Sequence, residues 1–335
     1  MKAGALFAGI GGFCLGFKQV GIKTIWAVEN DPAAVETYTH NLKDVRIITN
    51  NGKPASIKKV SVLGDRLEPV DVLHAGFPCQ SFSQAGRRKG FRDPRGRLLF
   101  EVIRIVKEFG KHKPSVLVLE NTPNFRNGEG GSWFIELMKE IRKLGYWFRN
   151  SSCAELDTFF LTELPQKRNR LYMLAFSMDR FPNGRFVFPN KFHQQKKRLS
   201  DFINFDGFID DDSYYLPTEN RYYQMIKREE VDKNVIYHLR KYIVRTKEPD
   251  ICPTLTANMG LGGHNVPFVF DAKGLRKLTE YECLSLQGFP QDYVFPDSVP
   301  RYKRYMQVGN AVTVPVVALL ASKVKKKLER SENGA

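Results

Sequence analysis

The chain has 335 residues, of which 42% are hydrophobic and 26% charged, so it can bury a large core. Its 25 Phe and 13 Tyr exclude disorder over most of the length, and no apolar run reaches the roughly 18 residues of a membrane helix. Lys and Arg number 52 against 36 Asp and Glu, which gives a net charge of +16. Such a charge favours a polyanionic partner, nucleic acid first, although it also keeps a protein soluble.

The five cysteines lie far apart and form no Cys-x-x-Cys pair, which indicates neither a disulfide framework nor a zinc site. Met1 is followed at once by Lys2 and a glycine-containing loop, which leaves no room for a signal peptide. We therefore expect a cytoplasmic protein without a metal or a membrane anchor.

Residues 1 to about 180 alternate short apolar runs with amphipathic stretches, the pattern of βαβ units around a parallel sheet. The predicted strands are Ala5–Phe7, Thr24–Val28, Val70–Ala75, Val116–Leu119 and Leu171–Phe176. Apolar residues spaced three and four apart predict helices over Pro32–Leu42, Leu98–Phe109 and Trp133–Lys143. The pattern predicts a doubly wound α/β domain with a mostly parallel sheet.

The residue composition and the hydrophobic pattern change after Phe176. The stretch Phe186–Tyr242 is rich in aromatic and charged residues and has no clean periodicity. This stretch predicts a smaller second domain of short strands and loops. Helical spacing returns after Thr279, which with Glu282 matches a capping box, and again from Val314 to about Leu328. We expect that last helix to return to the large domain.

A glycine loop, Phe7-Ala8-Gly9-Ile10-Gly11-Gly12, directly follows the first predicted strand. Glycines there let the backbone approach a ligand and open the next helix toward it. Glu29 stands 17 residues beyond Gly12, where an acidic side chain typically accepts hydrogen bonds from ribose hydroxyls. The two together predict a nucleoside-containing cofactor, either a dinucleotide or S-adenosylmethionine.

Two further segments follow predicted strands, at the edge where open α/β sheets place their chemistry. Gly76-Phe77-Pro78-Cys79-Gln80 precedes a basic loop, and positive charge lowers a thiol pKa and attracts phosphate. Glu120 follows the next strand, where desolvation raises the pKa of a carboxyl group and suits it to hold a proton. The plainer alternatives are a buried Cys79 and a helix-capping Glu120.

In the extended segment Gln166-Lys167-Arg168-Asn169-Arg170, alternate side chains share one face. Two guanidinium groups there are suited to hold a base carbonyl and a carboxylate. A solvated basic strand is the plainer alternative.

With these motifs in this order, the sequence resembles the DNA (cytosine-5)-methyltransferases. The resemblance extends over nearly the whole chain and includes three later motifs: Arg276-Lys277-Leu278-Thr279, Gln287-Gly288-Phe289-Pro290 and Gln307-Val308-Gly309-Asn310-Ala311-Val312. It implies an enzyme of the bacterial restriction-modification type with a Rossmann-like, S-adenosylmethionine-dependent fold.

The resemblance implies that the Cys79 thiolate adds to carbon-6 of a flipped cytosine while Glu120 protonates or hydrogen-bonds ring nitrogen 3. Carbon-5 then takes the methyl group of S-adenosylmethionine, which becomes S-adenosylhomocysteine. Arg170 is expected to hold the carbonyl oxygen of the base, and Arg168 to orient Glu120. The cofactor contacts implied are Phe7, Gly9, Gly11, Gly12, Glu29, Asn30, Ile57, Pro78, Leu98 and Asn310.

Double-stranded DNA is the implied partner, with a target-recognition domain between about residues 185 and 275. The implied DNA contacts are Gln80, Ser83, Arg87, Arg95, Gln166, Thr254, Asn258 and Gly262. We expect Asn258–His264 and Tyr237–Lys247 to read base edges in the major groove. Phosphate contact is the alternative for each arginine there.

The sequence departs from the family pattern at several positions. The usual Gly-Asp-Ile is Ala55-Ser56-Ile57, Asn30 stands where some members have tryptophan, and the usual Glu-Asn-Val is Glu120-Asn121-Thr122. A second phosphate-contacting serine is replaced by Ala85. Each departure leaves the catalytic groups in place.

Three other functions match the sequence less well. An RNA methyltransferase of the same fold, acting for example on tRNA, is the main alternative, but its Pro-Pro-Cys-Gln and Cys-Phe-Thr elements do not occur here. A catalytically dead homologue is expected to lose Cys79, Glu120 or Arg168, and all remain. A dinucleotide dehydrogenase gives no reason for Pro-Cys-Gln at the active edge.

The sequence predicts three segments: 1–184 for catalysis and cofactor binding, 185–275 for target recognition, and 276–335 returning to the catalytic domain. We expect a monomer in the bacterial cytoplasm, associated with the nucleoid. A cognate restriction endonuclease is a plausible partner.

Overall fold

The computed structural model describes residues 1–78, 98–190, 195–227, 234–240, 243–245, 248–261 and 264–333. The chain divides into two compact units. The first comprises Met1–Leu156, Asn169–Asn190 and Val314–Ala335, and the second comprises Asp157–Arg168 and Lys191–Thr313. These limits differ from the predicted segments, because Asp157–Arg168 and residues 276–313 make their contacts within the second unit.

An eight-stranded sheet forms the centre of the first unit, in the order β3-β2-β1-β6-β7-β10-β8, with β9 paired to β10. Within this sheet, β3, β2, β1, β6 and β7 run parallel to one another, whereas β10 is antiparallel to β7 and β8. The predicted mostly parallel sheet is therefore confirmed. The strand bounds are β1 Lys2–Leu6, β2 Lys23–Val28, β3 Arg46–Ile47, β6 Val72–Gly76, β7 Val116–Asn121, β8 Tyr146–Trp147, β9 Cys153–Asp157 and β10 Asn169–Ser177, beside a small hairpin of β4 Thr49–Asn50 and β5 Lys53–Pro54.

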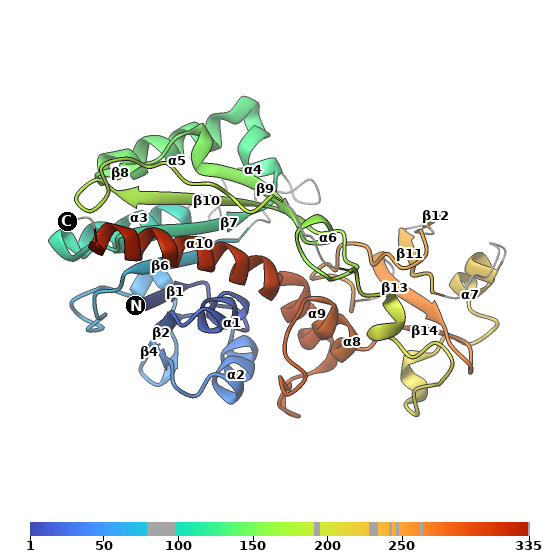
Figure 1. Ribbon diagram of the computed structural model, residues 1–335. Helices are drawn as coiled ribbons and strands as arrows, with labels where there is room; N and C mark the ends of the chain where they lie inside the picture. Colours follow the sequence, from blue (N-terminus) through green and yellow to red (C-terminus); the bar gives the residue numbers. More distant parts are fainter. Residues whose placement is uncertain are drawn as a thin grey trace. The chain divides into compact units, whose positions relative to one another are not determined.

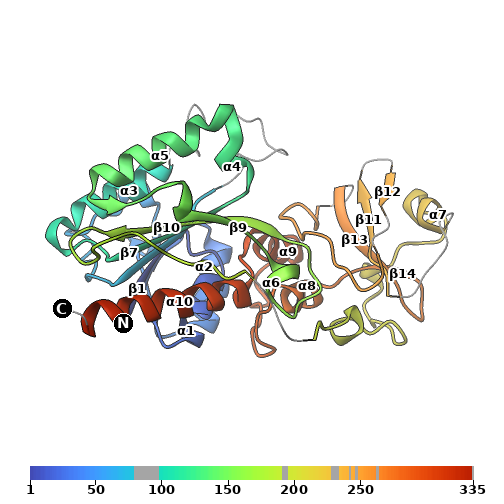
Figure 2. The same cartoon turned by 45° about the horizontal axis from the view of Figure 1, so that its top comes forward.

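Helices cover both faces of this sheet (Figures 1 and 2). One face carries α1 (Gly12–Gln19), α2 (Pro32–Asn41) and α10 (Val314–Asn333), and the other carries α3 (Leu98–Glu108), α4 (Asn124–Asn127) and α5 (Ser132–Lys143). The apolar stripe of α3 consists of Leu99, Val102, Ile105 and Val106, all buried in the main hydrophobic core. The spacing of these residues is the one that predicted the helix.

The last helix, α10, packs along α1, as expected for a helix that returns to the large domain. Gly16 makes this close approach possible, since a Cβ there would lie 2.6 Å from Val317. The helical stretch Arg301–Ser331 has the length and hydropathy of a membrane span, but 67% of its apolar window is buried. The core helix of a water-soluble protein meets the same two criteria.

The second unit contains a four-stranded antiparallel sheet in the order β12-β11-β13-β14. Its strands are β11 Tyr237–Arg240, β12 Ile243–Arg245, β13 His264–Phe270 and β14 Leu275–Lys277. The helices of this unit are α6 Thr158–Leu161, α7 Arg221–Lys227, α8 Glu280–Leu286 and α9 Arg301–Asn310. The predicted capping box is confirmed, because Thr279 Oγ1 accepts from Glu282 N at 3.1 Å and Glu282 Oε2 accepts from Thr279 N at 2.7 Å.

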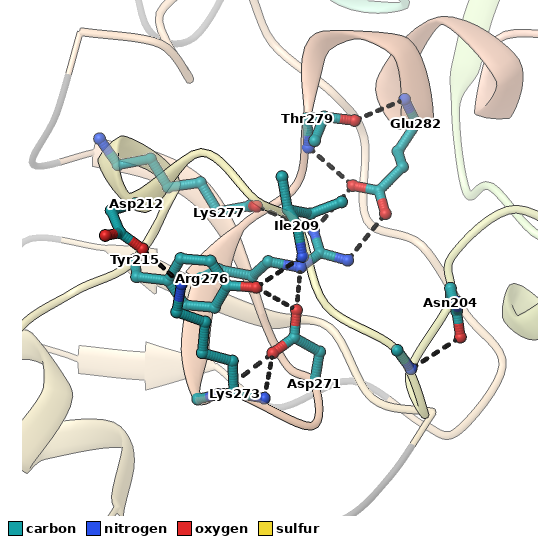
Figure 3. A network of polar contacts seen from close by, with 12 residues as sticks. Asn204, Ile209, Asp212, Tyr215, Asp271, Lys273, Arg276, Lys277, Thr279 and Glu282 are labelled. Atoms are coloured by element: carbon teal, nitrogen blue, oxygen red, sulfur yellow. Dashed lines mark hydrogen bonds and ion pairs between the residues drawn. The ribbon is translucent and has the colours of Figure 1, made fainter.

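A buried ionic cluster ties β14 to α8 and to the turn before β14 (Figure 3). The Arg276 side chain is fully buried and donates to both carboxylate oxygens of Glu282, at 2.8 and 2.9 Å, and to Asp271 Oδ2 at 2.6 Å. Tyr215 also donates to Asp271 Oδ2, at 2.7 Å. Burial alone lowers the pKa of Arg276, but the two carboxylates more than compensate and raise it, so the guanidinium stays charged.

Candidate active site

The residues predicted to act together follow three neighbouring strands of the first unit. The glycine loop follows β1, Phe77 and Pro78 follow β6, and Glu120 lies near the end of β7. Because these strands are parallel and adjacent, their carboxyl ends meet at one edge of the sheet. The strand order reverses between β1 and β6, and ligands of open α/β sheets bind at such a reversal.

Glu29 connects the glycine loop to the end of β2. Its Oε2 accepts a hydrogen bond from Gly9 N at 2.8 Å, and its Oε1 accepts from Asn30 N at 2.8 Å and Asp31 N at 2.9 Å. A carboxylate has about four acceptor positions, so a further one remains for a sugar hydroxyl. The glycine loop and the acidic residue thus lie together, as a nucleoside site requires.

The backbone of the loop adopts conformations that few residues tolerate. Gly11 caps α1 with φ of 83°, and a Cβ there would lie 2.4 Å from Leu42 Cδ1. Phe7 also has a positive φ of 55°, which costs a residue with a side chain roughly 1–2 kcal/mol. Gly9 has φ of 55° and nothing within 4 Å of its Cβ position. The space beside Gly9 suits the close approach of a ligand.

Gly76 lies between the Glu120 carboxylate and the start of α1. It pairs with Glu120 in the β6–β7 register. A Cβ on Gly76 would lie 3.4 Å from Glu120 Oε2 and 3.7 Å from the ring of Phe13, the second residue of α1. Glycine at this position therefore leaves room between the start of α1 and the Glu120 carboxylate.

Asn121 is a site residue whose contact the sequence analysis did not predict. Its side chain is buried and donates from Nδ2 to the carbonyl oxygen of Phe77 at 3.2 Å, while its Oδ1 accepts from Thr122 N at 2.8 Å. Asn121 thus fixes the backbone two residues before Cys79. The Glu120-Asn121 motif was the available signal, but a sequence does not reveal which carbonyl an amide will reach.

The two arginines of the Gln166–Arg170 segment belong to different units. Arg170, in β10, lies with Nε 3.4 Å from Glu120 Oε1, both side chains being less than one-fifth exposed. Arg168 is 2% exposed and donates to three backbone carbonyls of the second unit. The contact with Glu120 that was expected of Arg168 is therefore made by Arg170.

Three residues expected to contact DNA have internal partners. The buried Gln166 amide donates to Leu286 O at 2.8 Å, and the Thr254 hydroxyl donates its one proton to Lys167 O at 2.6 Å. Asn258 is exposed and accepts from Thr256 Oγ1 at 2.7 Å. In this arrangement Gln166 and Thr254 hold the backbone, and DNA contact through their side chains stays a prediction.

The other predicted residues divide into described and undescribed positions. Pro78 and Leu98 are partly buried, Asn30 and Asn310 are exposed, and Ile57 packs in the main core, in a single 3-10 turn. Six predicted residues lie outside the described part of the chain: Cys79, Gln80, Ser83, Arg87, Arg95 and Gly262.

A buried aromatic group packs against α1. His74, in β6, stacks on Phe13 and Phe17 at centroid distances of 4.9 and 5.2 Å. Burial lowers the pKa of His74 to about 3, so the ring is neutral at physiological pH. Burial likewise raises the pKa of Cys14 to about 11, in spite of a hydrogen bond from Tyr38. These groups are packing residues and not acids or nucleophiles at neutral pH.

Comparison with known proteins identifies this arrangement. A sequence model described as C-5 cytosine-specific DNA methylase matches residues 1–326. The chain belongs to the C-5 cytosine-specific DNA methylase family. Members of this family methylate DNA, and the curated relatives of the chain are Type II methyltransferases, which connects it to restriction-modification.

Two relatives illustrate the similarity. The chain is 36% identical to the Type II methyltransferase M.Bsp6I of Bacillus sp. (strain RFL6), over 98% of this chain and 99% of that protein. It is 30% identical to the Type II methyltransferase M.HpaII of Haemophilus parainfluenzae, over 96% of this chain and 88% of that protein. The chain is a DNA cytosine methyltransferase, as the sequence predicted.

Solved structures confirm the fold. The Entamoeba histolytica methyltransferase EhMeth superposes with a TM-score of 0.72 at 17% identity, covering 98% of each chain. The S. pombe Dnmt2 methyltransferase gives a TM-score of 0.71 at 19% identity, covering 98% of this chain and 99% of that chain. Both support the S-adenosylmethionine-dependent methyltransferase fold.

Proposed function

We propose that this methyltransferase transfers a methyl group to carbon-5 of a flipped cytosine in a short duplex DNA sequence, through a covalent adduct with Cys79. The observation that carries this proposal is the pairing of Gly76 with Glu120 at neighbouring strand ends, with Asn121 holding the Phe77 carbonyl two residues before Cys79. These contacts support the proposal because they hold Phe77, two residues before Cys79 in the sequence, and Glu120 at neighbouring strand ends.

S-adenosylmethionine, when bound, supplies an electrophilic methyl group. Gly9, Gly11 and Glu29 are the residues that would hold it, because the loop leaves open space beside Gly9 and the Glu29 carboxylate keeps an acceptor position for a ribose hydroxyl. Ser56 stands where the family usually has the aspartate that meets the adenine amino group. Ile57 is the neighbouring residue that would pack on the adenine.

Each catalytic group has one task in the proposed mechanism. The Cys79 thiolate forms a bond to carbon-6, and Glu120 gives a proton or hydrogen bond to nitrogen 3, so that electron density moves to carbon-5. Carbon-5 takes the methyl group and then loses its proton to water. The thiolate leaves from carbon-6, and Glu120 recovers its proton. Arg170 keeps Glu120 in place at 3.4 Å and is available to the base carbonyl.

A trapping experiment tests the adduct. Duplex DNA made with 5-fluorocytosine is incubated with S-adenosylmethionine and the enzyme, because fluorine at carbon-5 cannot leave as a proton and the adduct persists. We expect a covalent complex with the native protein and with Cys153→Ala, but none with Cys79→Ala. An adduct in the Cys79→Ala variant, or labelling of transfer RNA in place of duplex DNA, contradicts the proposal.

The net charge of +16 supports a DNA partner, since phosphate neutralisation by Lys and Arg releases counterions. We expect DNA affinity to fall steeply between 50 and 200 mM salt, by roughly a thousandfold if about six phosphates are contacted. A flat salt response contradicts this argument. A monomer in the bacterial cytoplasm, with a restriction endonuclease acting on the same site, completes the proposal.

A further inference from the structure

Arg168 makes an unusual set of contacts inside the second unit. Its Nη1 donates to Leu255 O at 2.7 Å, and its Nη2 donates to Gly309 O at 3.0 Å and Ala311 O at 2.6 Å. These carbonyls come from two segments more than fifty residues apart, one after Cys252 and one at the end of α9. A single buried guanidinium therefore joins them.

The segment that carries Arg168 is itself bonded to the first of these. Lys167 N donates to Cys252 O at 2.9 Å, and Cys252 N donates to Pro165 O at 2.7 Å. The Thr254 hydroxyl adds its bond to Lys167 O at 2.6 Å. Backbone and side chain thus hold residues 252–255 against Lys167 and Arg168.

The turn that follows, Thr256–Leu261, rests on α9. A Cβ on Gly309 would lie 2.2 Å from the carbonyl carbon of Thr256, and a Cβ on Gly260 would lie 2.7 Å from the Tyr305 side chain. Tyr305 is in turn fixed by its hydroxyl, which donates to Leu278 O at 2.5 Å. Glycine at position 309 lets the helix meet the backbone of the turn, and glycine at position 260 leaves room for the Tyr305 side chain.

The outer side of this turn is exposed while its inner side is buried. Met259 is 1% exposed, whereas Leu261 is 66% exposed and Asn258 also faces solvent. The Asn258 oxygen accepts from Thr256 Oγ1 at 2.7 Å and from Asn265 Nδ2 at 3.3 Å. With that oxygen engaged, the amide nitrogen supplies two donors, which match acceptors on base edges or phosphates.

We propose that Arg168 is a positioning residue for sequence recognition: by joining Leu255, Gly309 and Ala311 it holds the Thr256–Leu261 turn in the geometry that reads DNA. This inference rests on the proposed function and on the sequence-based prediction that the segment from Asn258 onward reads DNA. It differs from the orienting of Glu120, because it assigns Arg168 to the selection of the site and not to the chemical step.

Arginine is suited to this task for a physical reason. Its planar guanidinium presents five N–H donors in a fixed fork, so it can serve three carbonyls at defined angles. A lysine ammonium is a compact charge on a flexible stem and cannot span the same three oxygens. Arg168→Lys keeps the charge and removes the fork.

The test measures where the enzyme methylates. A plasmid of known sequence is treated with native enzyme, Arg168→Lys, or Arg142→Lys, and methylated cytosines are mapped by bisulfite sequencing. Arg142 is the matched control, because it also donates to a backbone carbonyl, that of Phe148 at 2.8 Å, but in the first unit. We expect Arg168→Lys to raise methylation at secondary sites relative to the native site roughly tenfold, and Arg142→Lys to leave the ratio unchanged.

Hydrogen exchange of the amides at 256–261 is a second readout, which should accelerate in Arg168→Lys but not in Arg142→Lys. Gly260→Ala disturbs the same turn through Tyr305 without touching Arg168, so it tests the proposal even if Arg168→Lys does not fold. It should also raise secondary methylation.

A lower kcat in Arg168→Lys with an unchanged site ratio and unchanged exchange overturns the proposal and returns Arg168 to the chemical step. An unchanged ratio in Gly260→Ala also overturns it. Failure of the proposed function itself looks different, because the native enzyme would then leave the plasmid unmethylated.

Discussion

The edge of the large sheet and the interior of the second unit rely on different kinds of polar side chain. At the sheet edge, Glu29 and Asn121 bind backbone groups of loops, and Glu120 is paired with Arg170 at a partly exposed strand end. In the second unit, Arg168 and Arg276 are buried and bind carbonyls and carboxylates within the same unit.

This difference follows from what each region has to do. Parallel strands already place their carboxyl ends together, so few side chains are needed to set the chemistry. The second unit has short strands and many loops, and a buried ionic or polar cluster fixes a loop geometry that regular secondary structure does not. Arg168 and Arg170 are two residues apart, yet Arg170 contacts Glu120 at the sheet edge and Arg168 binds carbonyls of the second unit.

The largest effect is expected at the sheet edge. Glu120→Gln removes the carboxyl group that we propose holds a proton, and general acid–base catalysis contributes about 10²–10⁴-fold. We expect kcat on duplex DNA to fall by roughly that factor, while the unfolding free energy changes little. Kinetics and urea denaturation measure the two quantities.

Glu68→Gln is the control, because the Glu68 side chain forms an exposed ion pair with Lys2. It should leave both quantities unchanged. A Glu120→Gln enzyme with native kcat would mean that the carboxyl group takes no part in the reaction.

In the second unit the large effect is on stability. Arg276→Met leaves Asp271 and Glu282 buried without their cation, and removing one partner of a buried pair costs about 3–5 kcal/mol. All three tryptophans, Trp26, Trp133 and Trp147, belong to the first unit. In Arg276→Met, the unfolding transition reported by tryptophan fluorescence should therefore occur at a higher urea concentration than the transition of the second unit, which hydrogen exchange of its amides reports.

Arg245→Met, at an exposed position of β12, is the matched control and should shift neither transition. Coincident early loss of both signals in Arg276→Met would show that the two units unfold as one.

A smaller effect is expected at the glycine loop. Glu29→Gln weakens the hydrogen bonds to Gly9, Asn30 and Asp31, and a bond to a charged group contributes about 1.5–3 kcal/mol. We expect S-adenosylmethionine affinity, measured by calorimetry, to fall at least tenfold, with DNA affinity unchanged. Glu36→Gln on α2 serves as the control. An equal loss of S-adenosylmethionine affinity in both variants would mean that Glu29 has no specific role in binding the cofactor.

The smallest effect concerns pH. Burial lowers the pKa of His74 to about 3, so between the ordinary value of 6.5 and about 3 the unfolded chain binds a proton that the folded chain does not. Stability therefore falls as pH falls through this window, by about 1.4 kcal/mol per pH unit from this group.

Urea unfolding at pH 7 and pH 5 should show a shallower pH slope for His74→Gln than for the native protein. His112→Gln, at an exposed residue, should keep the native slope. A native slope in His74→Gln would mean that other groups cause the acid sensitivity.

Much of the fold could be predicted because its signals are local. The strand preceding the glycine loop, the capping box at Thr279 and the amphipathic spacing of α3 each depend on residues close in sequence. The limits of the two units could not be predicted in this way. Asp157–Arg168 begins at the last residue of β9 and ends just before β10, and only its long-range contacts assign it to the second unit.

The sequence by itself determined the family and the mostly parallel sheet, and it predicted the groups at the carboxyl edge of that sheet, because motif order and hydrophobic periodicity are properties of the chain alone. Only the tertiary structure decided which partner each polar side chain has. Asn121 reaches Phe77, Arg170 reaches Glu120, and Arg168 reaches three distant carbonyls. Such pairings depend on distances between segments far apart in sequence, and packing of the whole core sets those distances.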